Sequence, residues 1–235
     1  NPAGIAHHEK WGINMMSFQE FESNFYSTEA YFPMNGMRFA IGYRSVSTTG
    51  IERSSINQST GRVELSGDTF KYQHSATTIG SSINIPFISG LSVGMSGTLY
   101  QIQADEYEGA GSSADIGMQY RGLEGIYLGA TMVNAIQSDI EWNTPSKTKE
   151  QLPKEVRIGT GIGLLEDALL FSAEIVKKQN RDVNIHLGTE YSIIDMMHLR
   201  SGISPEGIHV GTGLTLSVFT MDYSLLLPSY QKDIL

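Results

Sequence analysis

VRIGTGIGLL, residues 156–165, alternates between apolar and small residues. The even positions 158–164 are isoleucine, threonine or leucine, and the odd positions hold Arg157 and three glycines. A period of two is that of a β-strand. The glycines do not form a dinucleotide-binding loop, because G-x-G-x-x-G requires glycine or alanine where Leu164 stands, followed by a helix. The stretch therefore predicts a strand with one apolar face and one bare face.

The same alternation runs through residues 37–44, 183–191, 207–216 and 219–225, whereas helical periodicity is almost absent. Turn signals separate about thirteen segments of this kind, which predicts an all-β sandwich or barrel. The predicted strands are roughly 11–19, 25–33, 36–46, 68–84, 90–104, 112–121, 125–135, 154–164, 168–177, 182–192, 197–204, 207–217 and 218–227.

The connections between these strands favour an up-and-down barrel. Those after even-numbered strands are short, whereas the long ones, residues 47–67, 105–111 and 136–153, all follow odd-numbered strands. Short turns at one end and long loops at the other are typical of antiparallel barrels of the bacterial outer membrane. A Greek-key sandwich would mix the two classes, although a soluble barrel could also separate them. Such a barrel normally has an even number of strands. Thirteen therefore predicts a fourteenth, closing strand, which either is missing after PSYQKDIL, residues 228–235, or is hidden among the predicted segments.

The composition excludes several classes of protein. No run approaches the ~18 apolar residues of a membrane helix. The net charge of −9 argues against a nucleic-acid partner, because phosphate binding needs a basic surface. The chain has no cysteine, so neither a disulfide nor a thiolate metal site can form.

The polar faces of the later strands carry charges of both signs. If these faces line a lumen, their side chains come within reach across neighbouring strands, which lie ~4.8 Å apart. We predict a structural ion network there, with catalytic acids as the alternative. Its members are Arg157, Glu174, His186, Glu190, Arg200 and Asp222.

Aromatic residues lie near the ends of the predicted strands, as in the interfacial girdles of a membrane barrel in contact with lipid. They are Trp11, Phe25, Tyr26, Tyr31, Phe32, Tyr43, Trp142, Tyr223 and Tyr230. The polar segment 138–155, which contains Trp142, predicts an extracellular loop that could cover the pore or contact a partner.

No motif for catalysis, a metal or a cofactor is present. HHEK, residues 7–10, predicts a solvated segment, because adjacent histidines diverge and cannot form a zinc site like that of H-E-x-x-H. GMSG, residues 94–97, lacks the spacing of the G-x-S-x-G nucleophile motif. We therefore expect a protein that is not an enzyme and needs no cofactor.

Four stretches resemble the FadL superfamily of outer-membrane barrels, and more narrowly its PorV/PorQ-like branch with uncharacterised spirochaete relatives. NPAG, residues 1–4, resembles a motif near the start of these barrels. Residues 152–177 and 184–203 resemble two of the family's hairpins, and FTMDYSLLLP, residues 219–228, resembles a late strand.

The resemblance implies a fourteen-stranded barrel in the bacterial outer membrane. FadL-type members pass hydrophobic small molecules, and PorV-type members bind secreted cargo from the translocon of type IX secretion. The family motif places a ligand-related or plug-related site at Asn1, Pro2 and Ala3, although Asn before Pro also favours a purely structural tight turn. The family pattern further implies a single barrel domain over residues 1–235 whose native N-terminal segment and closing strand are both missing.

Three hypotheses follow from the sequence. The first is a non-enzymatic outer-membrane barrel for protein secretion or for passage of hydrophobic solutes. The second is a soluble β-sandwich that acts as a binding or adhesin domain, and the third is an outer-membrane enzyme with an active site at the barrel rim.

Overall fold

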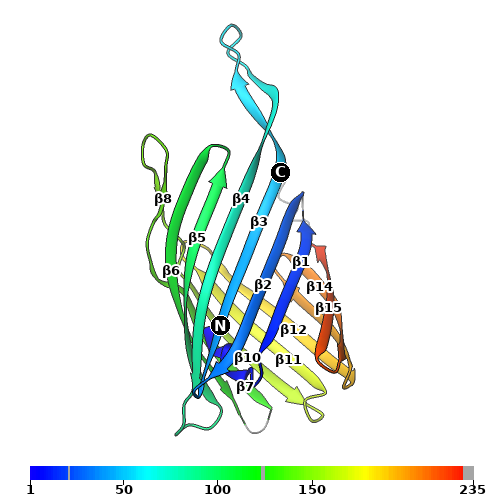
Figure 1. Cartoon of the computed structure of the whole chain (residues 1–235). Helices are drawn as coiled ribbons and strands as arrows, with labels where there is room; N and C mark the ends of the chain where they lie inside the picture. The colour runs from blue at the N-terminus through cyan, green and yellow to red at the C-terminus, as the bar shows by residue number, and fades with distance from the viewer. Residues whose placement is uncertain (21, 123–124, 230–235) are drawn as a thin grey trace.

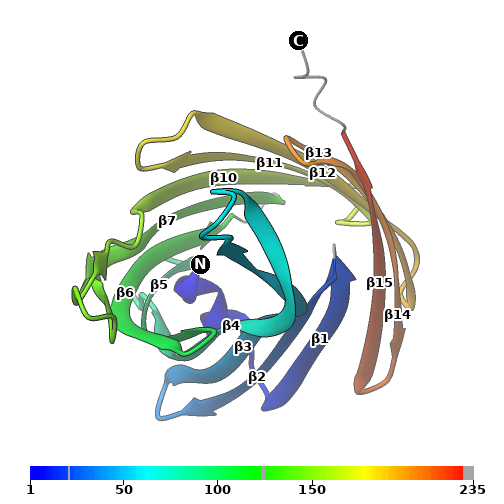
Figure 2. The same cartoon turned by 90° about the horizontal axis from the view of Figure 1, so that it is seen from above.

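The chain folds into one antiparallel sheet that curls around a central lumen (Figure 1, Figure 2). The computed structural model describes residues 1–20, 22–122 and 125–229. In the hydrogen-bonded order of the sheet, β1 to β7 are followed directly by β10 to β15, so thirteen strands form the wall. The short strands β8 and β9 lie off this path, with β8 paired to β6 and β9 paired to β8.

One short helix precedes the sheet, the 3-10 helix η1 (Pro2–His7). No helix in the described part of the chain is long and apolar enough to cross a membrane. The strands are β1 (Gly12–Glu20), β2 (Ser23–Met34), β3 (Met37–Ile56), β4 (Val63–Asn84), β5 (Leu91–Ala104), β6 (Tyr107–Arg121), β7 (Ile126–Gln137), β8 (Ile140–Trp142), β9 (Lys149–Glu150), β10 (Glu155–Leu164), β11 (Leu169–Lys178), β12 (Val183–Ile194), β13 (Met197–Ser204), β14 (Gly207–Leu216) and β15 (Phe219–Pro228).

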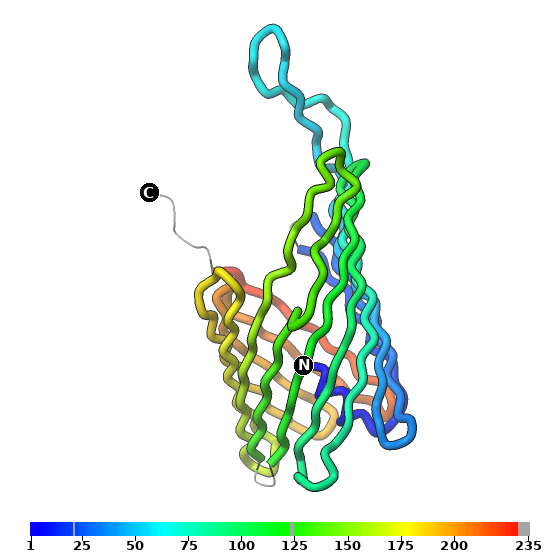
Figure 3. Tube along the Cα trace, turned by 90° about the vertical axis from the view of Figure 1, so that its left-hand side faces the viewer, coloured from blue at the N-terminus to red at the C-terminus, as the bar shows by residue number. Residues whose placement is uncertain are grey.

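The thirteen strands of the wall confirm the predicted all-β architecture. The predicted separation of short turns from long connections holds only in part, because of the three predicted long connections only the one between β7 and β10 is clearly longer than the other turns. The length of the first long connection was wrong, because residues 47–67 belong mostly to strands β3 and β4. Their hairpin rises far above the rest of the wall (Figure 1, Figure 3). Gly50 and Gly67 have positive φ angles of 76° and 79°, and the β3–β4 register shifts close to both. Because glycines at irregular positions are typical of loops, the sequence indicated a loop here, although the segment forms a hydrogen-bonded β-hairpin.

The two other long connections also contain more structure than predicted. Residues 105–111 reduce to a turn at 105–106, because β6 begins at Tyr107. Asp105 takes the left-handed conformation that this tight turn needs, with φ of 57°. Residues 136–153 include β8 and β9, which extend the wall beside β6.

Most apolar residues of the strands point out of the barrel. On β10, Ile158 is 58% exposed, whereas Gly161, three residues further on and on the opposite face, is buried. On β15, Tyr223 is 68% exposed. A soluble sandwich would bury these residues between two sheets, so the single sheet with an exposed apolar outer face contradicts the sandwich hypothesis.

The predicted aromatic girdle was only partly right. Tyr26 and Phe32 point outward, but their neighbours Phe25 and Tyr31 point into the lumen, because successive side chains of a strand face opposite sides. Trp142 packs against the luminal side of Gly109 instead of facing outward. Tyr230 lies outside the described residues.

The sheet ends at β1 and β15, which come round toward each other (Figure 2). Within the described residues, no hydrogen-bonded pairing joins them. Every neighbouring pair along the wall is antiparallel, so the first and the thirteenth strand run in the same direction. The closing strand that the strand count predicts after residue 235 therefore stays a prediction.

Candidate functional site

The N-terminal helix η1 lies inside the lumen against β3, β4, β5 and β6 (Figure 2). Asn1 caps this helix, because its side-chain oxygen accepts a hydrogen bond of 3.0 Å from the amide of Ala3. Pro2 stands in the first helical turn, where its missing N–H costs no hydrogen bond. The expected tight turn at Asn1–Ala3 therefore continues as a helical turn.

Asn1 also ties η1 to the wall. Its amide nitrogen donates to the carbonyl oxygen of Met118 on β6 at 2.9 Å and to that of Ala130 on β7 at 3.1 Å. The hydroxyl of Ser92 on β5, a fully buried residue, donates to the carbonyl oxygen of Ala3 at 3.3 Å. The NPA residues thus form a plug that three strands hold in place.

Glycines on the luminal face of the wall make room for this plug. A Cβ atom at Gly94 would lie 2.5 Å from the carbonyl carbon of Pro2, and one at Gly80 would lie 2.8 Å from Ile5. A Cβ at Gly117 would collide with the side chain of Asn1. Close approach of a second backbone is one reason for glycine inside a strand. These three glycines form the bed of the plug.

The segment after η1 is less solvated than predicted. The ring of His8 stacks on that of Tyr31 with centroids 3.7 Å apart, and its carbonyl oxygen accepts a hydrogen bond of 2.9 Å from Arg38. Burial lowers the pKa of both His7 and His8, and the charge of Arg121 adds to this effect. Glu9 and Lys10 are exposed, as expected.

A second feature of the lumen is an apolar cavity of about 390 Å³ between β1, β2, β3 and β4. Phe18 and Phe25 stack in its wall with ring centroids 4.3 Å apart. Its other apolar lining side chains are Met16, Val46 and Ala76. On β3, Val46 lies eight residues beyond Arg38, so the cavity is nearer than the plug to the end with the long connections.

Two basic side chains border this cavity, Arg44 from β3 and His74 from β4. The ring nitrogen Nε2 of His74 is buried and has no hydrogen-bond partner among the described residues. The ring centroid of His74 lies 5.8 Å from that of Tyr100. The cavity therefore combines an apolar wall with a polar edge, an arrangement typical of small-molecule sites.

The sequence could have indicated the residues of this cavity. Strict alternation puts apolar residues on one face only, but Met15 and Met16 are adjacent, as are Phe25 and Tyr26. Adjacent residues of a strand face opposite sides, so one residue of each apolar pair must face the lumen. We read the aromatic pair only as a girdle, and the cavity residues were missed.

The predicted luminal ion network exists as two separate clusters. In the first, Arg157 on β10 pairs with Glu155 of the same strand and lies 3.6 Å from Glu174 on β11. Lys178 lies 3.4 Å from Glu155, whose side chain is buried. Sequence reasoning missed both Glu155 and Lys178.

In the second cluster, Arg200 on β13 pairs with carboxylates on two other strands. Its Nε lies 2.5 Å from Glu190 on β12, and its Nη1 pairs with Asp222, which is on β15. This second pair reaches across β14, where Gly211 and Gly213 leave space. His186 stands beside Glu174 in the β11–β12 register, and the structure shows no ion pair between them.

The glycines of residues 156–165 on β10 are explained by contacts with neighbouring side chains of the wall. Gly161 is covered by Tyr127 of β7, whose Cβ would lie 3.4 Å from an added Cβ. Gly163 is covered by Asp167 from the following turn, which accepts a hydrogen bond of 3.0 Å from the hydroxyl of Tyr127. Side chains of the wall itself, not the plug, occupy the space that these glycines leave.

No group of three or more His, Cys, Asp and Glu side chains within the described residues is arranged to hold a metal ion. The lumen thus offers a capped plug, an apolar cavity and two ion clusters.

No protein-family model matches the sequence, and no curated protein matches it. Solved structures do match the fold. The toluene transporter TbuX of Ralstonia pickettii superposes with a TM-score of 0.66 at 12% identity, over 98% of this chain and 88% of that chain. The toluene transporter TodX of P. putida gives a TM-score of 0.65 at 12% identity, over 95% of this chain and 85% of that chain. At this identity the likeness concerns the fold, and the chain has the fold of a FadL-like β-barrel.

Proposed function

We propose that this protein is an outer-membrane barrel of the FadL type that passes small apolar solutes through its lumen. The exposed apolar outer face supports a location in the membrane. The fold shared with two proteins described as toluene transporters supports transport of this kind of solute.

The apolar luminal cavity is the observation that carries the proposal. The lumen of a barrel that passes ions or polar solutes is normally lined by polar residues, so a pair of stacked phenylalanines in the lumen indicates an apolar solute. Phe18 and Phe25 face the lumen together with Met16 and Val46, and the volume of about 390 Å³ suits a small ligand. The helix η1 lies against β3 and β4, two of the four strands of the cavity, nearer the short-turn end, so a solute leaving toward that end must pass the plug.

Substitution at Phe25 tests this function. We expect Phe25→Asn to weaken binding of toluene by roughly tenfold or more, because an aromatic contact is lost and a polar group is introduced. The measurement is displacement of a fluorescent naphthylamine probe by toluene from the purified protein in detergent. Phe25→Leu keeps the cavity apolar and should retain most of the affinity. Equal toluene affinity in the wild type and in Phe25→Asn would contradict a role for this cavity.

Transport also has to be measured in a membrane. We expect cells that lack their own channel for aromatic solutes to take up radiolabelled toluene faster when they carry the wild-type barrel than when they carry Phe25→Asn. Outer-membrane levels of both proteins are matched by immunoblot.

A secretion role like that of PorV-type proteins is the second candidate. It is supported by the sequence resemblance and by the β3–β4 hairpin, which rises beyond the rim (Figure 3). Ile56, Val63 and Leu65 of this hairpin are 64–70% exposed, as a protein-contact surface would be. This role predicts that secreted proteins co-purify with the wild type and are lost when the hairpin is shortened, whereas solute passage alone predicts no such change.

A further inference from the structure

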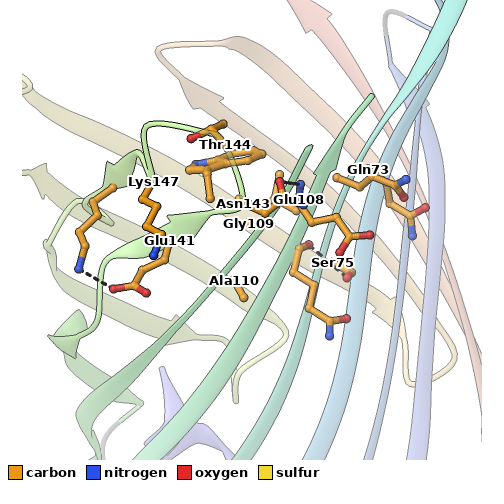
Figure 4. A pocket seen from close by; sticks show the side chains of 14 residues that line it. Gln73, Ser75, Glu108, Gly109, Ala110, Glu141, Asn143, Thr144 and Lys147 are labelled. Carbon is orange, nitrogen blue, oxygen red and sulfur yellow. Dashed lines mark hydrogen bonds and ion pairs between the residues drawn. The ribbon is translucent and has the colours of Figure 1, made fainter. Parts of the chain in front are cut away.

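A groove of about 940 Å³ with a mixed polar and apolar lining lies on the outside of the barrel, between β4, β5, β6 and the segment that carries β8 and β9 (Figure 4). Its floor is formed by two rows of side chains that are neighbours in the register. One row is Ser75, Gln101 and Ala110, and the other is Gln73, Gln103 and Glu108. Asn143, Thr144 and Lys147 border it from the loop.

The alternation of β5 shows that this groove is not part of the lumen. The even positions Thr98, Tyr100 and Ile102 are buried on the luminal side. The odd positions Met95 and Leu99 are 59% and 65% exposed on the outer face, and Gln101 and Gln103 follow on that same face. The groove thus begins where the outer face of the wall changes from apolar to polar, at the end with the long connections.

Four amide side chains line the groove, those of Gln73, Gln101, Gln103 and Asn143. The structure shows no hydrogen bond from the side chain of Gln101 or Gln103 to another described residue, so both amides are available to a ligand. The side chain of Asn143 is fixed, because its oxygen accepts a hydrogen bond of 2.8 Å from the amide of Glu108. Each free amide can donate and accept, which suits the hydroxyl groups of a sugar.

The charges bordering the groove balance. Glu141 and Lys149 pair with each other at 2.5 Å, which leaves Glu108 and Lys147 as one charge of each sign. An anionic phosphate group would need an excess of positive charge, and this groove lacks one. A neutral ligand rich in hydroxyl groups fits the lining better.

We propose that this groove binds the saccharide headgroup of a membrane glycolipid. The apolar outer face begins directly below the groove on β5, at Leu99, and further along on β6, at Ile116, and it is where acyl chains would pack. The acyl chains of a glycolipid can therefore pack on the apolar face while its sugar headgroup reaches the amide side chains of the groove. The proposal rests on the membrane location in the proposed function, but not on the passage of solutes.

A tryptophan next to the groove makes the proposal measurable. The chain has two tryptophans. Trp142 is one of the residues that line the groove, although its ring packs against the luminal side of Gly109, on the other face of the same strand. Trp11 precedes β1 and is 77% exposed. In Trp11→Phe protein, fluorescence emission reports on Trp142 alone. The protein is purified in a zwitterionic detergent, because maltoside detergents would themselves present a sugar headgroup.

The Trp11→Phe protein is reconstituted into phosphatidylethanolamine vesicles that contain increasing amounts of a diglycosyl diacylglycerol, or of phosphatidylglycerol as the anionic comparison. We expect a saturable change in Trp142 emission with the glycolipid and none with phosphatidylglycerol. Gln101→Leu combined with Gln103→Leu should weaken the glycolipid response at least tenfold, because each substitution removes a donor and an acceptor.

Gln19→Leu is the matched control, since Gln19 is an outward-facing glutamine near the same end of the barrel, on β1. It should leave the response unchanged. An equal response to phosphatidylglycerol, or an unchanged glycolipid response in the double variant, would overturn the proposal. Toluene displacement from the same double variant should remain as in the wild type, so that failure here is distinguishable from failure of the proposed function.

Discussion

The two halves of the barrel fill their luminal side in different ways. In the first half, the backbone of η1 packs on glycines of β4, β5 and β6 and is held by Asn1. In the second half, from β10 to β15, charged side chains from neighbouring strands meet around Arg157 and Arg200. Glycines occur on the luminal face of both halves, but only those of the first half are covered by the N-terminal segment that contains η1.

This difference shows that glycine in a barrel strand has no single meaning. Gly94 is required by a backbone that approaches within contact distance, whereas Gly213 leaves space for the guanidinium group of Arg200 to reach Asp222. The first kind of glycine should tolerate no side chain, and the second should tolerate one at the expense of an ion pair.

Gly94→Val should have the largest effect. We expect the added side chain to displace η1 and to lower the free energy of unfolding by about 1–3 kcal/mol, because overpacking forces backbone shifts. The measurements are urea unfolding in lipid vesicles and proteolysis of residues 1–10. Gly97→Val on the same strand is the control, since no atom lies within 4 Å of a Cβ added there. If residues 1–10 resisted proteolysis equally in Gly94→Val and in Gly97→Val, the proposed packing of η1 on Gly94 would be wrong.

Arg200→Met should have a smaller effect. Loss of the Arg200 guanidinium group leaves Glu190 and Asp222 without their shared partner. These two side chains are 33% and 54% exposed, so solvent screens their charges. We expect a loss of about 0.5–1 kcal/mol, which shrinks in high salt. Urea unfolding at low and high salt measures it, with Arg200→Lys as the variant that keeps the charge. A loss as large as that of Gly94→Val would remove the distinction between the two halves.

A fall in pH should loosen the plug. Burial lowers the pKa of His7 and His8 in the docked segment below the ordinary value of about 6.5. The released segment therefore binds more protons below this pH, and docking weakens as the pH falls through 6.5 toward the lowered pKa values. Hydrogen exchange at the amides of Gly4 and His8, corrected for intrinsic rates, measures the change. It should disappear when both histidines are replaced by glutamine.

Much of the wall could be predicted from the sequence, because period-two alternation is imposed locally by the direction of successive side chains. The extent of β3 and β4 could not, since their irregular glycines resemble those of a loop. The apolar cavity was also missed, because an aromatic pair such as Phe25 and Tyr26 is equally compatible with a girdle until the facing strands are known.

Residue type and alternation suggested which charges could meet in the lumen, but not which residues would pair. Arg157, Glu174, Glu190, Arg200 and Asp222 do lie in ion pairs, yet they form two clusters and include Glu155 and Lys178. Pairing depends on the stagger between strands, which a single strand does not encode. The same reason explains why His186 stands apart.

The sequence by itself determined the faces of the strands, since apolar residues such as Ile158 must leave the polar side when every second side chain points the other way. Only the tertiary structure decided what lies against each luminal glycine. For Gly94 it is the helix that begins at Pro2, and for Gly161 it is Tyr127 of the adjacent strand. Contacts of this kind join residues far apart in the chain, and they exist only once the sheet has curled around its own N-terminus.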